Sequence, residues 1–189
     1  SFDGIKVKDP GLVDYISLKP ILVPKTGARY AQQRFHKSKT NIVERLVNKL
    51  MVPGHRGKKH TITSYPMSGK SAQAYKITKQ VFELVEARTK KNPVEVFVEA
   101  LANAAPREEI VSIEYGGARY PKAVDCAPQR RVDIALRSFV QGSMAKSFSN
   151  KKTFAEALAD EIIGAYNVSP SSHGISKKLE LERQAEASR

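Results

Sequence analysis

The stretch SYPMSGKSAQ, residues 64–73, contains Gly69, Lys70 and Ser71 in the order that ends a phosphate-binding loop. A loop of that kind in a nucleotide hydrolase needs an earlier glycine, then four residues, then Gly-Lys-Ser or Gly-Lys-Thr, and it follows a buried strand. Here the earlier position is Ser64, and the segment KKHTITSYP, residues 58–66, is polar and closes with Pro66. We therefore expect no nucleotide hydrolysis, and we assign Lys70 to the backbone phosphates of a nucleic acid.

The other reactive side chains are scattered along the chain. His55 and His60 share one segment, but with a single Cys elsewhere no four-ligand set has the spacing of a zinc site. Cys126 precedes a helix start, which favours a thiolate, but no His or Asp partner is evident in the sequence. The adjacent acids are expected to be solvated, since neighbours on a helix do not face each other: Glu108-Glu109 and Asp160-Glu161. We expect no enzyme, no metal and no cofactor.

The charge of the chain is the stronger signal. The 189 residues carry a net charge of +13, which favours a polyanionic partner. Residues 1–91 hold 19 Lys and Arg against 6 Asp and Glu, whereas residues 92–189 hold 13 of each. A basic surface that only aids solubility mixes the two signs more evenly. The whole excess therefore lies in the N-terminal half, and we expect it to bind nucleic acid.

The pattern of apolar residues argues against a membrane partner. No run of about 18 apolar residues exists, so we expect no membrane span. The first residues carry charges throughout and do not resemble a signal peptide, and a single Cys fits a reducing compartment. We expect a cytoplasmic protein with no membrane partner.

The elements that must position the basic side chains begin with an extended arm. Residues 1–39 show no sustained period and are punctuated by Pro and Gly, so we expect an arm that orders on its partner. Within it Tyr30 and Phe35 alternate with Arg29 and Arg34. These rings can stack on bases or sugars, or they can tuck the arm onto the core, and the sequence leaves both open.

Helical periodicity fills most of residues 40–189. NIVERLVNKLM starts with an Asn41/Glu44 capping box and places Arg45 and Lys49 on its outer face. Residues 54–71 form a long basic connection before a helix at about 72–90, and NPVEVFVEALANAA begins a third helix. Three more helices follow in PQRRVDIALRSFVQGS, TFAEALADEIIGAY and ISKKLELERQAEASR.

Between the third and fourth helices the period changes from 3.6 to 2, which predicts a hairpin at about 108–125. Gly116-Gly117 is a two-residue turn signal. Closing on it pairs Glu114 with Arg119 and Ile113 with Tyr120. The predicted fold is therefore mainly α: about six helices in a domain at 40–189, a projecting β-hairpin, and the basic arm at 1–39.

The segments NIVERLVNKLM, NPVEVFVEAL, GGARYPKAVD, QRRVDIALR and ELERQAEASR occur in this order. Together they resemble the seven family of small-subunit ribosomal proteins in its archaeal or eukaryotic-type form, over about residues 38–189. The resemblance implies a protein without catalysis that binds the 3′ major domain of small-subunit rRNA and nucleates assembly of the subunit head. It also implies that the hairpin tip at Gly116-Gly117 faces tRNA at the exit site.

The implied partners are small-subunit rRNA, exit-site tRNA, neighbouring proteins of the head and the eleven-family protein, with no DNA. The alternative is an RNA-binding or maturation factor that acts off the ribosome. From charge and resemblance together, the expected rRNA contacts are Arg29, Arg34, Lys37, Lys39, Arg45, Lys49, Arg56, Lys58, Lys59, Lys70, Lys76, Arg119, Lys122, Arg130, Arg131 and Arg137.

Overall fold

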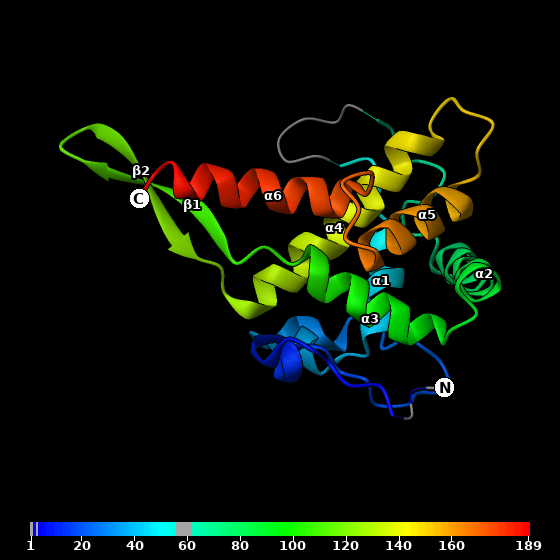
Figure 1. Ribbon diagram of the computed structural model, residues 1–189. Helices are drawn as coiled ribbons and strands as arrows, with labels where there is room; N and C mark the ends of the chain where they lie inside the picture. Colours follow the sequence, from blue (N-terminus) through cyan, green and yellow to red (C-terminus); the bar gives the residue numbers. More distant parts are fainter. Residues whose placement is uncertain (1, 3, 56–61) are drawn as a thin grey trace.

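The structure is a computed structural model that describes residues 2, 4–55 and 62–189. Within that part of the chain the α-helices are α1 (Ile42–Leu50), α2 (Ser71–Thr89), α3 (Pro93–Ala104), α4 (Pro128–Ser147), α5 (Phe154–Tyr166) and α6 (His173–Glu186). The strands β1 (Glu108–Tyr115) and β2 (Ala118–Asp125) form an antiparallel hairpin between α3 and α4 (Figure 1). The mainly helical fold with an inserted hairpin is confirmed.

Local capping explains where several helices begin. The Asn41 side chain accepts a hydrogen bond from the Val43 N–H at 2.9 Å and so starts α1. Thr153 and Glu156 form the capping box of α5. The box expected at Asn41/Glu44 was wrong: the buried Glu44 carboxylate accepts instead from the N–H and the hydroxyl of Thr26, at 2.9 and 2.6 Å.

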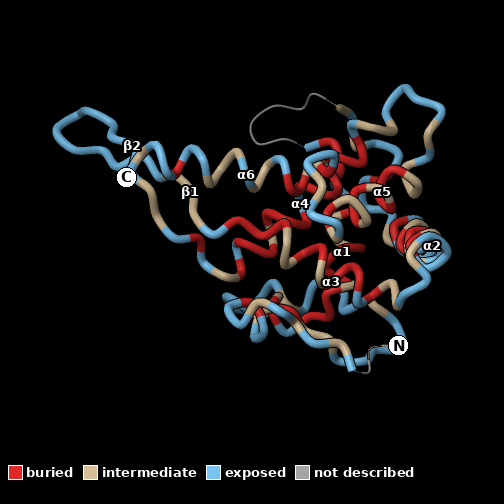
Figure 2. Tube along the Cα trace, viewed as in Figure 1, coloured by how far each residue is buried: buried red, intermediate tan, exposed pale blue. Residues whose placement is uncertain are grey.

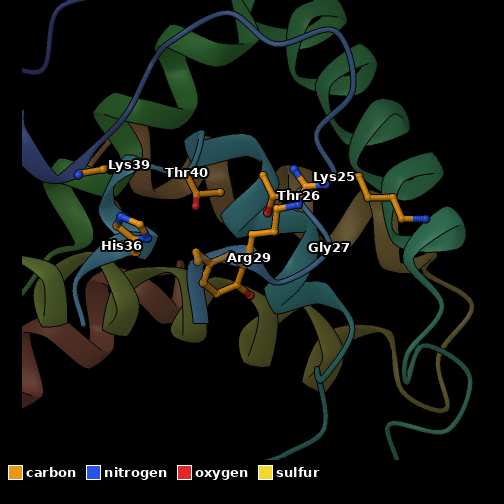
Figure 3. A pocket seen from close by; sticks show the side chains of 8 residues that line it. Lys25, Thr26, Gly27, Arg29, His36, Lys39 and Thr40 are labelled. Atoms are coloured by element: carbon orange, nitrogen blue, oxygen red, sulfur yellow. The ribbon is translucent and has the colours of Figure 1, made fainter. Parts of the chain in front are cut away.

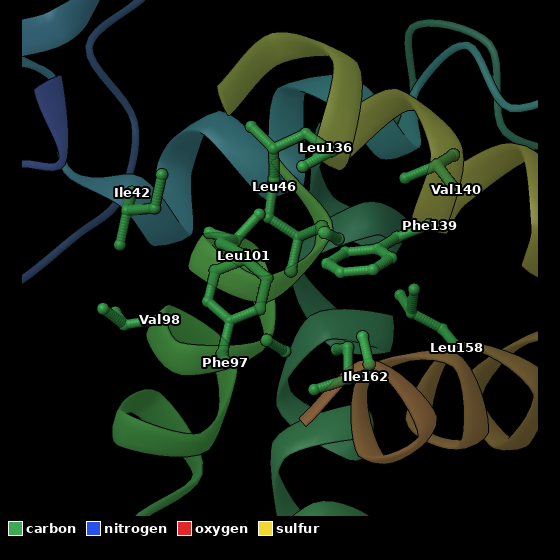
Figure 4. Packing of buried hydrophobic residues seen from close by; sticks show 14 of the residues in the cluster. Ile42, Leu46, Phe97, Val98, Leu101, Leu136, Phe139, Val140, Leu158 and Ile162 are labelled. Carbon is green, nitrogen blue, oxygen red and sulfur yellow. The ribbon is translucent and has the colours of Figure 1, made fainter. Parts of the chain in front are cut away.

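The helices pack around α4, which contacts α1, α3, α5 and α6. Phe97, Leu101, Phe139 and Ile162 are fully buried and meet in the centre of the cluster (Figure 4). Burial of each such side chain contributes about 1.5–3 kcal/mol to folding. The core therefore fixes α1 and α4 relative to each other, and both helices supply cations to the surface described below.

The hairpin extends away from the helical body beside the C-terminal end of α6 (Figure 1). Its register pairs Glu114 with Arg119 and Ile113 with Tyr120, as the turn predicted. Gly116 and Gly117 have φ of 60° and 81°, the left-handed conformation that a type I′ hairpin turn requires at both central positions. The distal half of the hairpin is exposed (Figure 2).

The N-terminal segment lies along the helical body. It contains three short 3-10 helices, η1 (Pro10–Tyr15), η2 (Arg29–Gln32) and η3 (His36–Lys39). Leu12 and Ile16 are buried in the main core, and Asp9 forms an ion pair with Arg131 of α4 at 2.7 Å. The first part of this segment is thus packed against the helices, while the boundary between an arm at 1–39 and a domain at 40–189 stays a prediction.

The sequence predicted that the adjacent acids Glu108-Glu109 and Asp160-Glu161 are solvated, but in the structure each carboxylate has a partner. Glu109 accepts two hydrogen bonds from Arg130, at 2.5 and 2.6 Å, and Glu108 pairs with Arg189. Asp160 pairs with Arg88 and Lys152. Glu161 is fully buried at the junction of α4, α5 and α6. Tertiary packing brings a donor to each of them, which adjacency in the sequence does not reveal.

Candidate nucleic-acid interface

Three cavities lie next to one another where residues 25–40, α1 and α4 meet. The first and second share Tyr30 and Thr40 in their walls, and the second and third share Lys49. We call these three cavities together the basic groove. Asp133 is the one acid among the described residues that line them, against Lys25, Arg29, Lys37, Lys39, Arg45, Lys49 and Arg137.

The first cavity has a volume of about 690 Å³ and lies inside the segment 25–40. In Figure 3, His36 and Lys39 lie on one side of it and Thr26 and Lys25 on the other. Arg29 belongs to η2, and Lys39 ends η3. Arg29 and Lys39, both expected to contact rRNA, thus line the same cavity. Lys25 and His36 line it as well.

The second cavity has a volume of about 190 Å³, and the ion pair between Arg45 and Asp133 lies in its wall. Arg45 of α1 donates to Asp133 of α4 at 2.9 Å and to the Tyr15 carbonyl at 2.8 Å. Lys37 pairs with the other oxygen of Asp133. The expected outer-face position of Arg45 was wrong, because only 6 % of the side chain is exposed. Arg45 therefore supports the groove from within.

The third cavity, of about 210 Å³, is bordered by Lys49, His55 and Arg137. Burial and then the nearby Arg137 guanidinium hold the pKa of Lys49 below its ordinary value. In the described part of the chain neither Lys49 nor Arg137 has an acid within ion-pair distance. A bound anion at this point would further offset the repulsion between these two like charges, which the Asp133 carboxylate opposes only in part.

Other expected contacts lie outside the groove. Arg131 is buried, donates to the Pro106 carbonyl at 3.0 Å and pairs with Asp9. Arg130 is exposed beside the base of the hairpin but is paired with Glu109. Arg119 and Lys122 are exposed on β2, and Arg119 lies 3.6 Å from Glu114. The structure therefore separates these four from the cations of α1 and residues 25–40.

The region around the start of α2 is a second separate group. Lys70 precedes α2, donates to the Tyr65 carbonyl at 3.1 Å and lies over the Tyr65 ring. Lys76 is exposed on α2.

Arg34 lies over the Phe35 ring, 5.1 Å from its centre, at the surface. The remaining three expected contacts lie outside the described residues: Arg56, Lys58 and Lys59.

Cys126 is a buried free cysteine just before α4. Burial raises the pKa of the Cys126 thiol to about 11, with the Glu109 carboxylate adding to the rise, which is opposite to the shift that a helix start favours. In residues 2, 4–55 and 62–189 no cluster of three His, Cys, Asp or Glu could hold a metal ion. None of the helices in that part is long and apolar enough to cross a membrane.

Several groove residues were missed at the level of sequence. Lys25 and Thr26 stand in a Pro- and Gly-punctuated stretch that gave no fixed position, and Asp133 sits among apolar helix residues. The sequence did contain a signal for Asp133, because this acid comes two residues after Arg130-Arg131 in an otherwise basic part of the helix. Its partner Arg45 is 88 residues away, and helical periodicity alone cannot pair them.

A family model described as Ribosomal protein S7p/S5e matches residues 12–189. A curated relative named small ribosomal subunit protein uS7, from Nanoarchaeum equitans, is 55 % identical over 188 residues, covering 100 % of this chain and 95 % of the relative. A second of the same name, from Archaeoglobus fulgidus, is 45 % identical over 185 residues, covering 98 % and 90 %.

The chain belongs to the ribosomal protein S7p/S5e family. This confirms the resemblance read from the sequence. A member of this family is a protein of the small ribosomal subunit, so the chain acts in translation as part of a cytoplasmic ribonucleoprotein. The family is one of structural ribosomal proteins, not of enzymes.

Proposed function

We propose that the chain binds the 3′ major domain of small-subunit rRNA directly, through the basic groove, and so nucleates assembly of the subunit head. The observation that carries this is the lack of balancing acids: Asp133 is the one carboxylate among the described residues that line the three cavities. Phosphates supply the missing negative charge, and they bind Lys and Arg with little dependence on sequence.

The shape of the groove supports a folded RNA as its ligand. Its cations come from residues 25–40, α1 and α4, which are held together by the core and by the Arg45–Asp133 pair. A rigid array of this kind loses little conformational entropy when it binds. The function proposed has no catalytic step, and no metal or cofactor takes part in it.

The test is binding of the full chain to a transcript of the cognate 3′ major domain over a salt series. With on the order of 6–10 phosphates neutralised, affinity should fall about 10³–10⁵-fold between ~50 and ~200 mM salt. Lys49→Ala with Arg137→Ala should weaken binding and lower the salt slope by about two. A wild-type affinity that is flat across the salt series contradicts the proposal.

A matched control removes the same charge elsewhere. Lys79→Ala with Lys151→Ala also removes two exposed cations, neither of which lines the groove. This variant should bind within about twofold of the wild type. Equal losses in both double variants would mean that net charge, and not the groove, determines binding.

For the hairpin we propose a separate role, with the Gly116-Gly117 turn facing tRNA at the exit site and the protein near the eleven-family protein. Val111, Ile113, Tyr115 and Tyr120 are large apolar side chains of the hairpin left exposed, and they suit a partner that covers them. Replacing residues 112–121 by Asn-Gly should preserve rRNA affinity but remove hairpin-dependent protection of exit-site tRNA. Unchanged tRNA protection would contradict this role.

The alternative is an RNA-binding factor that acts off the ribosome, and fractionation separates the two. On a sucrose gradient of cell lysate the chain should sediment with small subunits and whole ribosomes. A mainly free pool would favour the alternative, even with rRNA binding intact.

A further inference from the structure

The segment from Lys19 to Asn41 forms a closed loop that holds the first cavity of the groove. We call it the basic loop. It contains six Lys and Arg and no acid. The Asn41 amide donates to the Lys19 carbonyl at 2.8 Å, and the N–H of Ile42 donates to Ser17 at 3.0 Å. These bonds fix the two ends of the loop beside each other.

The middle of the basic loop is anchored as well. Glu44 of α1, 2 % exposed, accepts hydrogen bonds from the N–H and hydroxyl of Thr26. The one acid at this place is thus used to hold the backbone, and its burial keeps it out of the cavity lining. A loop anchored at its neck and at its middle keeps a fixed hollow without a partner present.

The backbone of the basic loop stores strain. Ala28 and Phe35 have φ of 62° and 66°, a left-handed conformation that disfavours a side chain with a Cβ. Residues in such conformations concentrate at ligand clamps, where the surrounding structure holds them in place. Ala28 immediately precedes η2, which carries Arg29 and Tyr30. The strained turn therefore sets the position of the one aromatic side chain in the cavity wall.

The chemistry of the cavity combines a ring with cations. Tyr30 borders both the first and the second cavity, and Arg29, His36 and Lys39 line the first. A volume of about 690 Å³ is in the range of small-ligand sites. Proteins recognise unstacked RNA bases by stacking them on aromatic side chains while cations hold the phosphates. A base inside a duplex cannot enter such a hollow.

We infer that the cavity of the basic loop takes one unpaired nucleotide of the bound RNA, with its base on the ring of Tyr30 and its phosphates at Arg29 and Lys39. This inference rests on the proposed rRNA binding. It assigns to the groove a selective contact, in addition to its general attraction for phosphates, and makes Tyr30 the residue that distinguishes an extruded base from a regular helix.

The experiment uses the full chain and the 3′ major-domain transcript. Tyr30→Ala should raise Kd about tenfold, a loss typical of one stacked base, with an unchanged salt slope because no cation is removed. Tyr30→Phe keeps the ring and should stay within about twofold. Tyr75→Ala, an exposed tyrosine on α2 that does not line the cavity, is the matched control and should bind like the wild type.

A second measurement stands independently of any folding defect. Ultraviolet crosslinking of the wild-type complex, followed by trypsin, should join the peptide 30–34 to a single nucleotide that is unpaired in the RNA. A crosslink to a paired nucleotide, or none at this peptide, overturns the inference. So does a Kd for Tyr30→Ala equal to the wild type, or an equal loss for Tyr30→Phe, which would indicate a hydroxyl contact.

Two outcomes distinguish failure of the stacked nucleotide from failure of the proposed rRNA binding. If the wild type does not bind the transcript, the proposed function fails; if it binds with a steep salt slope but ignores Tyr30, only the stacked nucleotide fails. Free 5′-AMP at millimolar concentration tests a mononucleotide as the occupant instead. Binding of AMP through Tyr30 with RNA binding unchanged would overturn the assignment to RNA, whereas Tyr30-dependent displacement of the RNA would support it.

Discussion

The cations of the basic groove and those around the hairpin, α5 and α6 differ in what faces them. In the second region Arg130 meets Glu109, Lys152 meets Asp160 and Lys177 meets Glu180. In the groove, the acids available to the described cations are Asp133, which holds Arg45 and Lys37, and the buried Glu44. The region around the hairpin, α5 and α6 pairs these cations with its own acids, whereas Lys25, Arg29, Lys39, Lys49 and Arg137 of the groove have no acid within ion-pair distance among the described residues.

This difference teaches that a residue's sign alone does not indicate an RNA contact. Arg130, Arg131 and Arg137 lie within one helix, yet the first is paired at the surface, the second is buried and paired, and the third faces the groove without an acid. The unbalanced cations are the ones with free energy to gain from phosphate.

The largest expected effect is on stability in the balanced region. Glu161 is fully buried, pairs with Lys146 at 2.5 Å and accepts from Ser172 and the His173 N–H at 2.9 and 2.7 Å. Glu161→Ala should lower the free energy of unfolding by about 3 kcal/mol, because it leaves buried donors unpaired. Urea denaturation followed by circular dichroism measures it.

Glu186→Ala is the control for that variant, since Glu186 is exposed on α6. It should change the free energy of unfolding by less than about 0.5 kcal/mol. A loss below about 1 kcal/mol for Glu161→Ala would show that the buried carboxylate is not a principal link between α5 and α6.

The next effect compares two arginines of α4 in RNA binding. Arg137→Ala should raise Kd for the 3′ major-domain transcript about fivefold and lower the salt slope by about one. Arg130→Ala should raise it less than twofold, because Glu109 already neutralises the Arg130 guanidinium. Filter binding at several salt concentrations measures both. The reverse order would place the RNA at the hairpin base and not at the groove.

A smaller effect comes from removing an acid in the balanced region. Glu109→Gln leaves Arg130 without its carboxylate partner and should tighten RNA binding by about twofold, with a slightly steeper salt dependence. Circular dichroism confirms that the variant is folded before binding is measured. Weaker binding than the wild type would mean that the ion pair positions Arg130 for the RNA.

The smallest effect is expected in the hairpin. Arg119 and Glu114 are largely exposed and 3.6 Å apart, so Glu114→Gln should change the free energy of unfolding by less than about 0.5 kcal/mol. Urea denaturation tests this. A loss above 1 kcal/mol would show that the pair is coupled to the base of the hairpin and is not an isolated surface contact.

Much of the fold follows from local sequence patterns. The turn at Gly116-Gly117 gave the register of the hairpin through Glu114–Arg119, because a two-residue turn with left-handed backbone fixes which residues are opposite. Helix positions followed from periodicity and caps, as at Thr153 and Glu156. These features depend on residues a few positions apart, and the sequence contains all of that information.

The candidate site was predictable only in part. The charge asymmetry placed the expected nucleic-acid-binding surface in the N-terminal half. The residues that line the groove include the expected contacts Arg29, Lys39, Lys49 and Arg137. Their contact with rRNA stays a prediction. Arg45 was expected on the outer face of its helix and Arg131 in contact with rRNA, but both side chains are buried. Helical periodicity gives the direction of a side chain but not what the neighbouring segment brings against it.

By itself the sequence determined the class of partner, the hairpin and the helical core, since charge, turn chemistry and periodicity are properties of short segments. Only the tertiary structure decided which cations remain unbalanced. The acids that neutralise Arg45 and Arg131 are Asp133 and Asp9, which are brought to them by packing of distant segments. Electrostatic pairing depends on distances of a few ångström in space, and those distances exist only once the chain has folded.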